Sequence, residues 1–499
     1  MSHILDALKR HAQNTPRQIA LQDQEVVLAY GELPGIVEQL AGQLLDTSSQ
    51  TVAILADNSV AWALADLAIL QAGLACIPMP LFFSPGQLLH VLKTAGVDEI
   101  LTDQPEPLLA ALHYPGLAAL PFYRNLQRIQ LPGAPTSPAT LPEGTRKVTF
   151  TSGTTGEPKG VCLPLETLES VAASLQTASA AARDDRHLCL LPLSTLLENI
   201  AGIYTPLLAG ATVCVPKLAD VGLTGSSALD ARRLLASLGD WQACTAIMVP
   251  QMLQAVLATG SKDLRLPPRL RYLAVGGAPL SATLLESAEA LGWPVFEGYG
   301  LSECGSVVAV NQPGMQRRGS VGKPLPHLDV SFAEDGEILV RTGRWLGYLG
   351  QAQTGETIAT GDFGHFDEDG FLHITGRKKN IFITSFGRNV SPEWVEGELA
   401  AHPGILQAAV FGEGRPFNSA VIVPLPGTAA DTIQAALDKA NRRLPDYAQV
   451  RAWIAAGEPF TPLNQLATAN GRLRRERIHG RYAGQIETLY QFPARTGQQ

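Results

Sequence analysis

Short apolar runs alternate with longer helical stretches along most of the chain. Typical runs are TVAIL (51–55), ATVCV (211–215), TAIMV (245–249) and RYLAV (271–275). Their length and β-branched content are those of buried strands, and strands that alternate with helices usually pair in parallel. The pattern therefore predicts an α/β fold of layered, mostly parallel sheets covered by helices.

The pattern changes twice toward the C-terminus. From about residue 320, short strand patterns separated by Gly and Asp turns, such as AEDGEILVRTG and FDEDGFLHITG, predict a small β subdomain. After GRKKN (376–380) the chain shows helix and strand patterns of its own: SPEWVEGELAAHP, LQAAVFG, SAVIVPL and AADTIQAALDKANRRL. We therefore expect a large N-terminal domain over residues 1–378 and a small α+β C-terminal domain over residues 379–499.

Two stretches bear on export and membrane insertion. The first residues, MSHILDALKRHAQNTP, lack the apolar core of a secretory signal, and their apolar positions fit an amphipathic helix. The segment 59–83 is the most membrane-like of the chain, yet it contains Asp66 and Gln71 and is interrupted by Pro78 and Pro80. It predicts a buried helix followed by a strand, and no transmembrane segment.

Composition narrows the class of protein. At 499 residues, with 45% hydrophobic and 17% charged residues, the chain is too long for a single core and fits a well-packed soluble enzyme. A net charge of −8 offers no basic surface for nucleic acid. The six cysteines include no CxxC pair, which favours free, mostly buried thiols and no structural metal site. We expect an enzyme in the reducing cytoplasm.

The segment FTSGTTGEPKG (150–160) is the first candidate for chemistry. Small side chains let its backbone curl until N–H groups converge on an anion, while hydroxyls and a lysine add donors. The residues concerned are Thr151, Ser152, Gly153, Thr154, Thr155, Gly156 and Lys159. Gly160 excludes the loop of nucleotide kinases, which needs Ser or Thr after the lysine. The segment predicts a different phosphate loop, with an ordinary surface turn as the alternative.

Further short motifs follow downstream. They are GGAPL (276–280), EGYGLSE (297–303), GSVGKPLP (319–326), GYLG (347–350), TGD (360–362), GRKKNIFI (376–383) and GRNVSPEWVE (387–396). Each alone is short enough to arise by chance, but their common order and spacing make chance implausible. From about residue 10 to 480 the chain resembles the adenylate-forming, AMP-binding superfamily of acyl-CoA synthetases, peptide-synthetase adenylation domains and beetle luciferases.

The resemblance implies a two-step reaction at one site. A carboxylate attacks the α-phosphate of ATP with Mg²⁺ present, which gives an acyl adenylate and pyrophosphate, and a thiol such as that of coenzyme A then displaces AMP. Because the first step joins two anions, catalysis should consist mainly of positioning and of neutralising phosphate charge. The segment 151–159 would then lie over the β- and γ-phosphates.

The resemblance also gives roles to single residues. Glu303 would bind Mg²⁺ in catalysis, and Ser302 would place its hydroxyl at a phosphate oxygen. Asp362 would accept hydrogen bonds from both ribose hydroxyls, and Arg377 would also reach the ribose. The nucleotide site would further contain Gly300, and its adenine slot Gly276, Gly277, Ala278 and Tyr299. The alternatives are a solvated helix carboxylate for Glu303, a turn residue for Asp362 and a surface cation for Arg377.

Lys379 falls at the hinge of the family. There the C-terminal domain would swing between the two half-reactions, so that residues 1–378 bind ATP and the acyl substrate while residues 379–499 move. Lys379 would contribute to catalysis through this motion. A solvated linker lysine is the alternative.

Two positions depart from the family pattern. The catalytic lysine of the family lies in a motif Thr-x-x-Gly-Lys-hydrophobic-x-Arg, and TANGRLRR (468–475) places Arg472 at that position. Arg472 could replace the lysine, or adenylation could be slowed in favour of the thioester step, or the chain could be a non-catalytic nucleotide binder. In LPLSTLLENIAGIY (191–204), Glu198 and Asn199 either orient the acyl pocket or cap a helix.

The same region bears on the substrate. Amino-acid activators of the family place an aspartate here to bind the amine, and residues 191–204 contain none, which argues against an amino acid unless Glu198 takes that role. The candidate pocket walls are apolar: Leu196, Ile200, Ile203, Met248, Val249, Val307 and Val308. We expect a fatty acid to be passed to coenzyme A. The alternatives are an acyl-AMP ligase that loads an acyl carrier protein, and a nucleotide-dependent regulatory protein.

Overall fold

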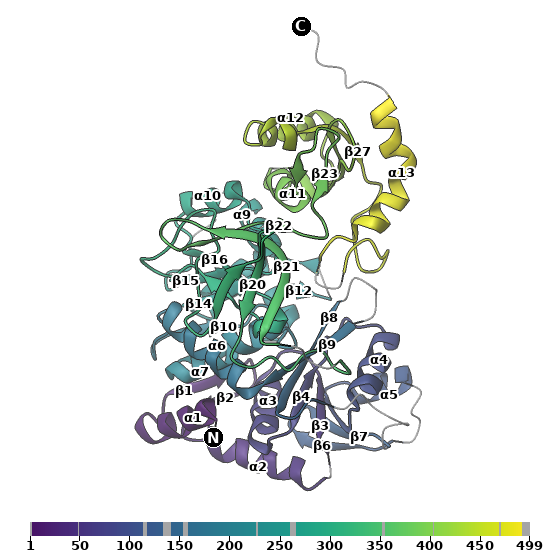
Figure 1. Cartoon of the computed structure of the whole chain (residues 1–499). Helices are drawn as coiled ribbons and strands as arrows, with labels where there is room; N and C mark the ends of the chain where they lie inside the picture. The colour runs from purple at the N-terminus through teal and green to yellow at the C-terminus, as the bar shows by residue number, and fades with distance from the viewer. Residues whose placement is uncertain are drawn as a thin grey trace.

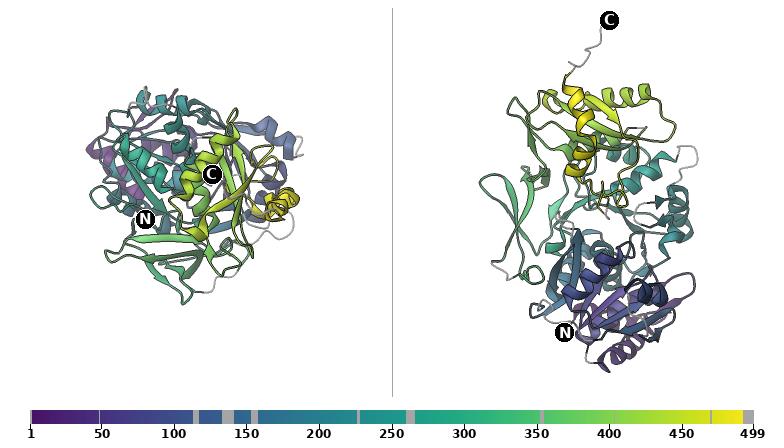
Figure 2. Two further views of the ribbon diagram at one scale, coloured as in Figure 1. Left: turned by 90° about the horizontal axis from the view of Figure 1, so that it is seen from above. Right: turned by 90° about the vertical axis from the view of Figure 1, so that its right-hand side faces the viewer.

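The larger, N-terminal part of the chain forms a broad base on which the residues after about 380 are stacked (Figures 1 and 2). The structure is a computed structural model that describes residues 2–47, 49–112, 117–132, 141–152, 158–225, 228–259, 266–351, 355–402, 404–468 and 471–491. Two large sheets, a smaller antiparallel sheet and a C-terminal α+β unit make up the described chain. This is the fold class that the sequence predicts.

One large sheet has the strand order β6-β7-β5-β3-β4-β8-β9. Its members are β3 (Thr51–Leu55), β4 (Ala75–Pro78), β5 (Glu99–Thr102), β6 (Ala119–Tyr123), β7 (Leu126–Gln130), β8 (Thr145–Ser152) and β9 (Pro158–Pro164). The four central strands pair in parallel, and the edge strands β6, β7 and β9 are antiparallel. Every residue of β3, β4 and β5 is buried, as expected for parallel strands covered on both faces.

The second large sheet has the order β18-β17-β16-β15-β14-β10-β11-β1-β2. Its members are β1 (Ile19–Gln22), β2 (Val27–Ala29), β10 (Arg186–Leu188), β11 (Thr212–Cys214), β14 (Thr245–Met248), β15 (Tyr272–Val275), β16 (Val295–Tyr299), β17 (Ala309–Val310) and β18 (Lys323–Pro324). The pairings from β1 through β11, β10, β14 and β15 to β16 are all parallel. The apolar runs at 211–215, 245–249 and 271–275 are therefore strands, as predicted.

Helices cover these sheets. They are α1 (His3–Asn14), α2 (Leu33–Leu45), α3 (Val60–Ala72), α4 (Pro85–Ala95), α5 (Pro105–Leu112), α6 (Leu165–Ala178), α7 (Thr205–Ala209), α8 (Ala231–Asp240), α9 (Pro250–Ala258) and α10 (Ala282–Ala290). The shorter turns are a π-helix η1 (Glu198–Tyr204) and the 3₁₀ helices η2 (Leu218–Val221) and η3 (Ser302–Cys304), and a small hairpin is formed by β12 (Leu223–Thr224) and β13 (Ala228–Leu229).

Helix α3 explains the membrane-like stretch of the sequence. It begins after Ser59, whose hydroxyl accepts a hydrogen bond from the backbone N–H of Trp62, and it ends at Gly73 in the left-handed region. The helix is apolar on all sides because nearly all of its residues are buried in the core, and β4 follows it. The predicted helix and strand are thus confirmed. In the described chain, no helix is both long and apolar enough to cross a membrane.

The predicted β subdomain is an antiparallel sheet of β19 (Asp329–Phe332), β20 (Glu337–Arg341), β21 (Thr357–Phe366) and β22 (Leu372–Arg377). After it come the hairpin β23 (Phe382–Ile383) and β24 (Asn389–Val390), then α11 (Pro392–Ala400), β25 (Ile405–Phe411), β26 (Asn418–Pro424), α12 (Ala430–Asn441), the 3₁₀ helix η4 (Asp446–Ala448), β27 (Val450–Ala455) and α13 (Arg475–Gln491). These C-terminal elements pack around hydrophobic clusters of their own.

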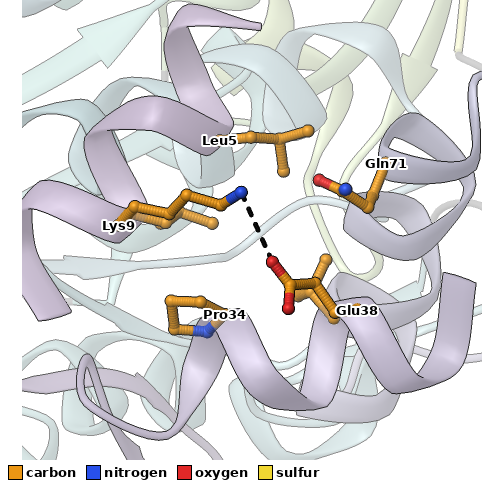
Figure 3. A pocket seen from close by; sticks show the side chains of 7 residues that line it. Leu5, Lys9, Pro34, Glu38 and Gln71 are labelled. Atoms are coloured by element: carbon orange, nitrogen blue, oxygen red, sulfur yellow. Dashed lines mark ion pairs between the residues drawn. The ribbon is translucent and has the colours of Figure 1, made fainter.

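A small surface depression lies between α1, α2 and α3, far along the chain from the motifs (Figure 3). It is lined by Leu5, Leu8, Lys9, Pro34, Val37, Glu38 and Gln71. The ammonium group of Lys9 lies 3.3 Å from the Glu38 carboxylate across its mouth. Because it contains no motif residue, the depression is not the candidate active site.

Candidate active site

The glycine motif and the EGYGLSE motif meet at one edge of the second large sheet. Gly276 and Gly277 follow β15, Tyr299 ends β16, and the two strands pair in parallel. A side chain at Gly276 would lie 3.0 Å from the carbonyl oxygen of Gly298, and Gly277 has a φ of +84°. Glycine is therefore required at both positions, and Ala278 follows them. The predicted adenine slot lies at this edge.

Asp362 joins two other predicted site residues, Tyr299 and Arg377, and the three come from three strands. The phenol of Tyr299 donates a hydrogen bond of 2.7 Å to one carboxylate oxygen of Asp362, and Nε of Arg377 donates one of 2.8 Å to the other. Asp362 and Arg377 are also direct partners across β21 and β22. Asp362 is 4% exposed. The structure thus holds a fixed carboxylate beside the predicted adenine slot, where ribose hydroxyls would need an acceptor.

Charge and burial act together on these side chains. Burial, and then the Asp362 carboxylate, raise the pKa of Tyr299, so its hydroxyl stays a hydrogen-bond donor. Burial by itself lowers the pKa of Arg377, but the attraction of Asp362 outweighs it, and the net pKa is raised. Tyr299 and Arg377 therefore keep the protonation states in which they hold the carboxylate.

Glu303 lies on η3, shortly after β16 ends. The hydroxyl of Tyr348 donates a hydrogen bond of 2.7 Å to its Oε1, and the ammonium group of Lys159 lies 5.8 Å from the centre of the Tyr348 ring. Within the described chain, no side chain or backbone group bonds to Oε2 of Glu303. A half-buried carboxylate with one oxygen that no described group contacts has the donor chemistry that Mg²⁺ uses alongside substrate phosphates. Ser302 begins the same turn.

Tyr348 is a site residue that the sequence analysis missed. It belongs to the GYLG motif, and it forms a bridge to Val161 on β9, next to which Leu349 donates to the carbonyl of Gly160. This pairing places Tyr348, from the connection between β20 and β21, beside β9, the strand that carries Lys159 of the predicted phosphate loop. The aromatic residue inside a glycine motif was the signal that could have found it.

The predicted phosphate loop joins β8 and β9. Thr151 and Lys159 are partners across these two strands, and the Lys159 side chain is exposed to solvent. Ser152 ends β8. The side chain of Ser152 and the residues Gly153, Thr154, Thr155 and Gly156 lie outside the described part of the chain. Their role toward phosphate stays a prediction.

Arg472 approaches the same place from the C-terminal part. Its guanidinium interacts electrostatically with Arg377, Asp362 and Glu303. Burial first, and then the like charge of Arg377, lower the pKa of Arg472, while Asp362 and Glu303 act in the opposite direction. By its surface area Arg472 is nevertheless an exposed residue, so the crowding by neighbouring charges leaves it open to solvent. The residue that departs from the family pattern therefore lies within electrostatic range of the predicted ribose and magnesium ligands.

Arg475 fixes the segment that carries Arg472. It donates to both carboxylate oxygens of Glu396, and it also lies 3.3 Å from Glu393. Both acids are on α11. Burial lowers the pKa of Arg475, yet the attraction of Glu396 outweighs it and the net pKa is raised. The backbone of 472–475 is thus tied to α11 by a charged, mostly buried contact.

Lys379, the predicted hinge residue, is exposed. Its neighbour Lys378 pairs with Asp335 at 2.6 Å and with Glu337 at 2.8 Å. On the other side, Asn380 donates to Glu393 at the start of α11. The chain is therefore anchored to the β subdomain before Lys379 and to the C-terminal unit after it, which leaves Lys379 between two anchors. A hinge at this residue remains a prediction.

Glu198 and Asn199 are fully buried on the π-helix η1, and neither caps a helix. Glu198 accepts hydrogen bonds from the His187 ring at 3.1 Å and from the backbone N–H of Leu191 at 3.1 Å. Cys189, a buried free thiol like the other five cysteines, completes a group within 4.8 Å. The carboxylate is satisfied by these donors, so the helix-cap alternative is wrong and no metal ion is needed to explain the cluster.

The predicted acyl-pocket walls lie in two adjoining hydrophobic clusters. One contains Leu196, Ile200, Ile203, Val307 and Val308, and the other contains Met248 with Val249 packed against it. Leu197 and Ala201 of the region around η1 contact both clusters. The irregular helix thus forms the seam between them, and π-helices often occur at functional sites.

Comparison with known proteins agrees with this arrangement. A family model described as AMP-binding enzyme matches residues 8–349, and one described as AMP-binding enzyme C-terminal domain matches residues 379–493. The chain is 30% identical to the long-chain-fatty-acid–CoA ligase FadD15 of Mycobacterium bovis, over 88% of each protein. It is 31% identical to a feruloyl-CoA synthase of Amycolatopsis sp, over 85% of this chain and 89% of that protein.

Solved structures show the same fold. The anthranilate CoA ligase AuaEII in complex with anthranoyl-AMP has a TM-score of 0.80 at 21% identity and covers 96% of this chain and 97% of its own. The O-succinylbenzoate CoA synthetase MenE of Bacillus subtilis, in complex with ATP and magnesium, has a TM-score of 0.74 at 24% identity and covers 94% of this chain and 98% of its own. Motif order, fold and family match together show that the chain belongs to the AMP-binding enzyme family.

Proposed function

We propose that the protein activates an apolar carboxylic acid, with a fatty acid as the first choice, to its acyl adenylate and transfers the acyl group to coenzyme A. Membership of the family makes the protein an AMP-forming acid–thiol ligase whose co-substrates are ATP with Mg²⁺ and coenzyme A. The observation that carries the proposal is the bonded group of Tyr299, Asp362 and Arg377 beside the ends of β15 and β16, with Glu303 on the turn that follows β16.

The side chains at this edge suit the first half-reaction. As the substrate carboxylate bonds to the α-phosphorus and pyrophosphate leaves, negative charge moves among the phosphate oxygens, and Arg472 with Lys159 would offset it. Glu303 would hold Mg²⁺, which neutralises phosphate charge when bound. Asp362, fixed by Tyr299, would orient the ribose. In the second half-reaction the thiol sulfur bonds to the acyl carbon and AMP leaves.

An apolar acid is supported by two features of the acyl region. The candidate walls are buried aliphatic side chains. Glu198, the residue that could bind an amine, is fully buried, and each of its oxygens already accepts a hydrogen bond, from His187 or from Leu191, which argues against a role in binding an amino-acid substrate. Among the relatives, the name of FadD15 specifies long-chain fatty acids, whereas the feruloyl-CoA synthase is named for an aromatic acid.

The test measures pyrophosphate release with ATP, Mg²⁺ and a panel of fatty and aromatic acids, then thioester formation with coenzyme A or with a holo acyl carrier protein. Fatty acids and coenzyme A should give the highest rates. Transfer to the carrier alone would favour the acyl-AMP ligase alternative, and no pyrophosphate release with any acid would favour a nucleotide-binding regulatory protein.

The role of Arg472 is tested in the same assay. Arg472→Ala should reduce pyrophosphate release by about 100-fold or more while ATP still binds, because the contact matters mostly in the transition state. Arg472→Lys should retain activity, and Arg474→Ala is the matched control. Parental rates in Arg472→Ala would remove the residue from the mechanism.

A further inference from the structure

The C-terminal unit rests on two helices of the N-terminal part. Figure 1 shows α11 beside α9 and α10, with α12 above them. Gln254 on α9 donates to the carbonyl oxygen of Ala400 at the end of α11, and Thr283 on α10 donates a hydrogen bond of 3.1 Å to Glu398. These contacts lie on the side of α11 that faces the large sheet, so they bear on how the two parts are oriented.

A bidentate ion pair reinforces this interface. Arg443, which follows α12, donates two hydrogen bonds of 3.1 and 3.0 Å to the two carboxylate oxygens of Glu286 on α10. Its Nε also lies 3.5 Å from Glu398 on α11. The Arg443 hydrogen bonds are the main cause of a lowered pKa at Glu286. Two parallel bonds fix orientation as well as distance, which a single lysine contact would not do.

A continuous series of charged contacts leads from this interface to Arg472. Arg443 reaches Glu398 on α11, and the same short helix carries Glu396, which holds Arg475. Arg475 is three residues from Arg472. Because α11 carries both Glu398 and Glu396, the contact of Arg443 with Glu286 on α10 is linked through this one helix to the segment that bears Arg472.

We propose that the Arg443–Glu286 ion pair holds the C-terminal unit in the orientation of this structure, in which Arg475 fixes the segment of Arg472 on α11. Arg443 is then a positioning residue for acyl-adenylate formation that acts through α11 and Arg475. The thioester step, which uses another orientation if the predicted hinge operates, does not depend on the pair. This inference rests on the proposed function for its kinetic consequence, but the orientation itself can be measured without substrate.

The kinetic test compares the half-reactions in Arg443→Ala, Glu286→Ala and the double variant, with Arg442→Ala as a neighbouring exposed control. A half-exposed ion pair contributes modestly, so each single change should slow pyrophosphate release about two- to fivefold. Thioester formation from supplied acyl adenylate should be unchanged. The double variant should be no slower than the singles, because the two side chains act as one contact. Equal losses in both half-reactions, or additive losses in the double variant, would overturn the proposal.

The second test needs no activity. Lys378 and Lys379 are exposed between the two parts of the protein, so a lysine-specific endoproteinase should cut there faster when the interface is weakened. Arg443→Ala and Glu286→Ala should both raise the rate of this cut over that of the parent and of Arg442→Ala, with unchanged thermal midpoints. An unchanged rate would refute the orientation role, whatever reaction the protein catalyses. An absence of pyrophosphate release in the parent would instead refute the proposed function.

Discussion

Replacement of Lys147 tests how the two large sheets are joined beneath the site. Lys147 lies on β8, just before the predicted phosphate loop, and is 1% exposed. Its ammonium group donates to Asp66 on α3 at 2.7 Å, to Asn199 on η1, and to the hydroxyl of Tyr204 at 3.0 Å. Asn199 and Tyr204 also donate to Asp66, at 2.9 and 2.6 Å. The Asp66 carboxylate on α3 thus collects donors from β8 and the π-helix, and the thiol of Cys76 on β4 donates to it as well.

The expected loss of stability in Lys147→Met follows from the burial of the Asp66 carboxylate. In Lys147→Met the packing volume is nearly kept, but Asp66 remains fully buried without its cation. Removing one partner of a buried ion pair costs about 3 to 5 kcal/mol, which corresponds to a drop of roughly 5 to 15 °C in the thermal midpoint of this part of the protein. Lys93→Met, at an exposed position on α4, should change the midpoint by less than about 2 °C. A double change of Lys147→Met with Asp66→Leu should recover part of the loss, because no buried charge remains.

The loss of stability in Lys147→Met should change with pH in a definite direction. Burial alone raises the pKa of Asp66, but Lys147 and the hydrogen bonds of Asn199 and Tyr204 outweigh it, so the net pKa is lowered. In the parent this contribution to stability is present above the ordinary pKa of aspartate and is lost only as the pH falls through the lowered value. In Lys147→Met, burial raises the pKa of Asp66, and protonation relieves the cost as the pH falls. Scanning calorimetry at several pH values should show the midpoint deficit shrinking toward acid. A deficit below about 2 °C at neutral pH, or one that grows toward acid, would refute this account.

The remaining predictions concern the site and the hinge. Glu303→Gln should keep the thermal midpoint and lose most pyrophosphate release, because a neutral amide binds Mg²⁺ poorly, and unchanged release across a magnesium titration would exclude Glu303 as a ligand. Lys379→Pro should leave acyl-adenylate formation largely intact and impair thioester formation, since proline fixes φ between the two anchored segments. Equal loss of both steps in a folded variant would argue against a hinge at Lys379.

The pattern of apolar and polar residues predicted individual strands and helices, because each of these depends on residues close together in the sequence. The runs at 245–249 and 271–275 became central parallel strands because strands covered on both faces are apolar at every position. The segment 59–83 became α3 and β4 because Asp66 and the prolines exclude a membrane span. Asp362 and Arg377 were found through motifs, and their direct pairing across β21 and β22 was not visible in the sequence.

The missed features all depend on contacts between distant positions. Lys147 lies 81 residues from Asp66, and Arg443 lies 157 residues from Glu286. Nothing in the flanking sequence of either lysine or arginine indicates a partner, because the pairing exists only once the sheets and helices are assembled. One alternative for Glu198 was a helix cap, because it lies near a helical pattern. It is instead buried on η1, where its carboxylate bonds to His187. Tertiary packing, not propensity, decided these positions.

The electrostatics around Arg472 show why its orientation needs support from elsewhere. Burial and the like charge of Arg377 together outweigh the attraction of Asp362 and Glu303, so that the net pKa of Arg472 is lowered. The exposed guanidinium stays charged, but burial and the charge of Arg377 make this place less favourable for the cation before a nucleotide is bound. The phosphates of a bound nucleotide would supply the missing negative charge. Before the nucleotide binds, contacts remote from the site must keep the C-terminal unit in place, and the interface around Glu286 and Arg443 offers such contacts. An arginine at position 472 is therefore compatible with catalysis as long as the bound nucleotide stabilises its charged guanidinium and the interface keeps the C-terminal unit in place.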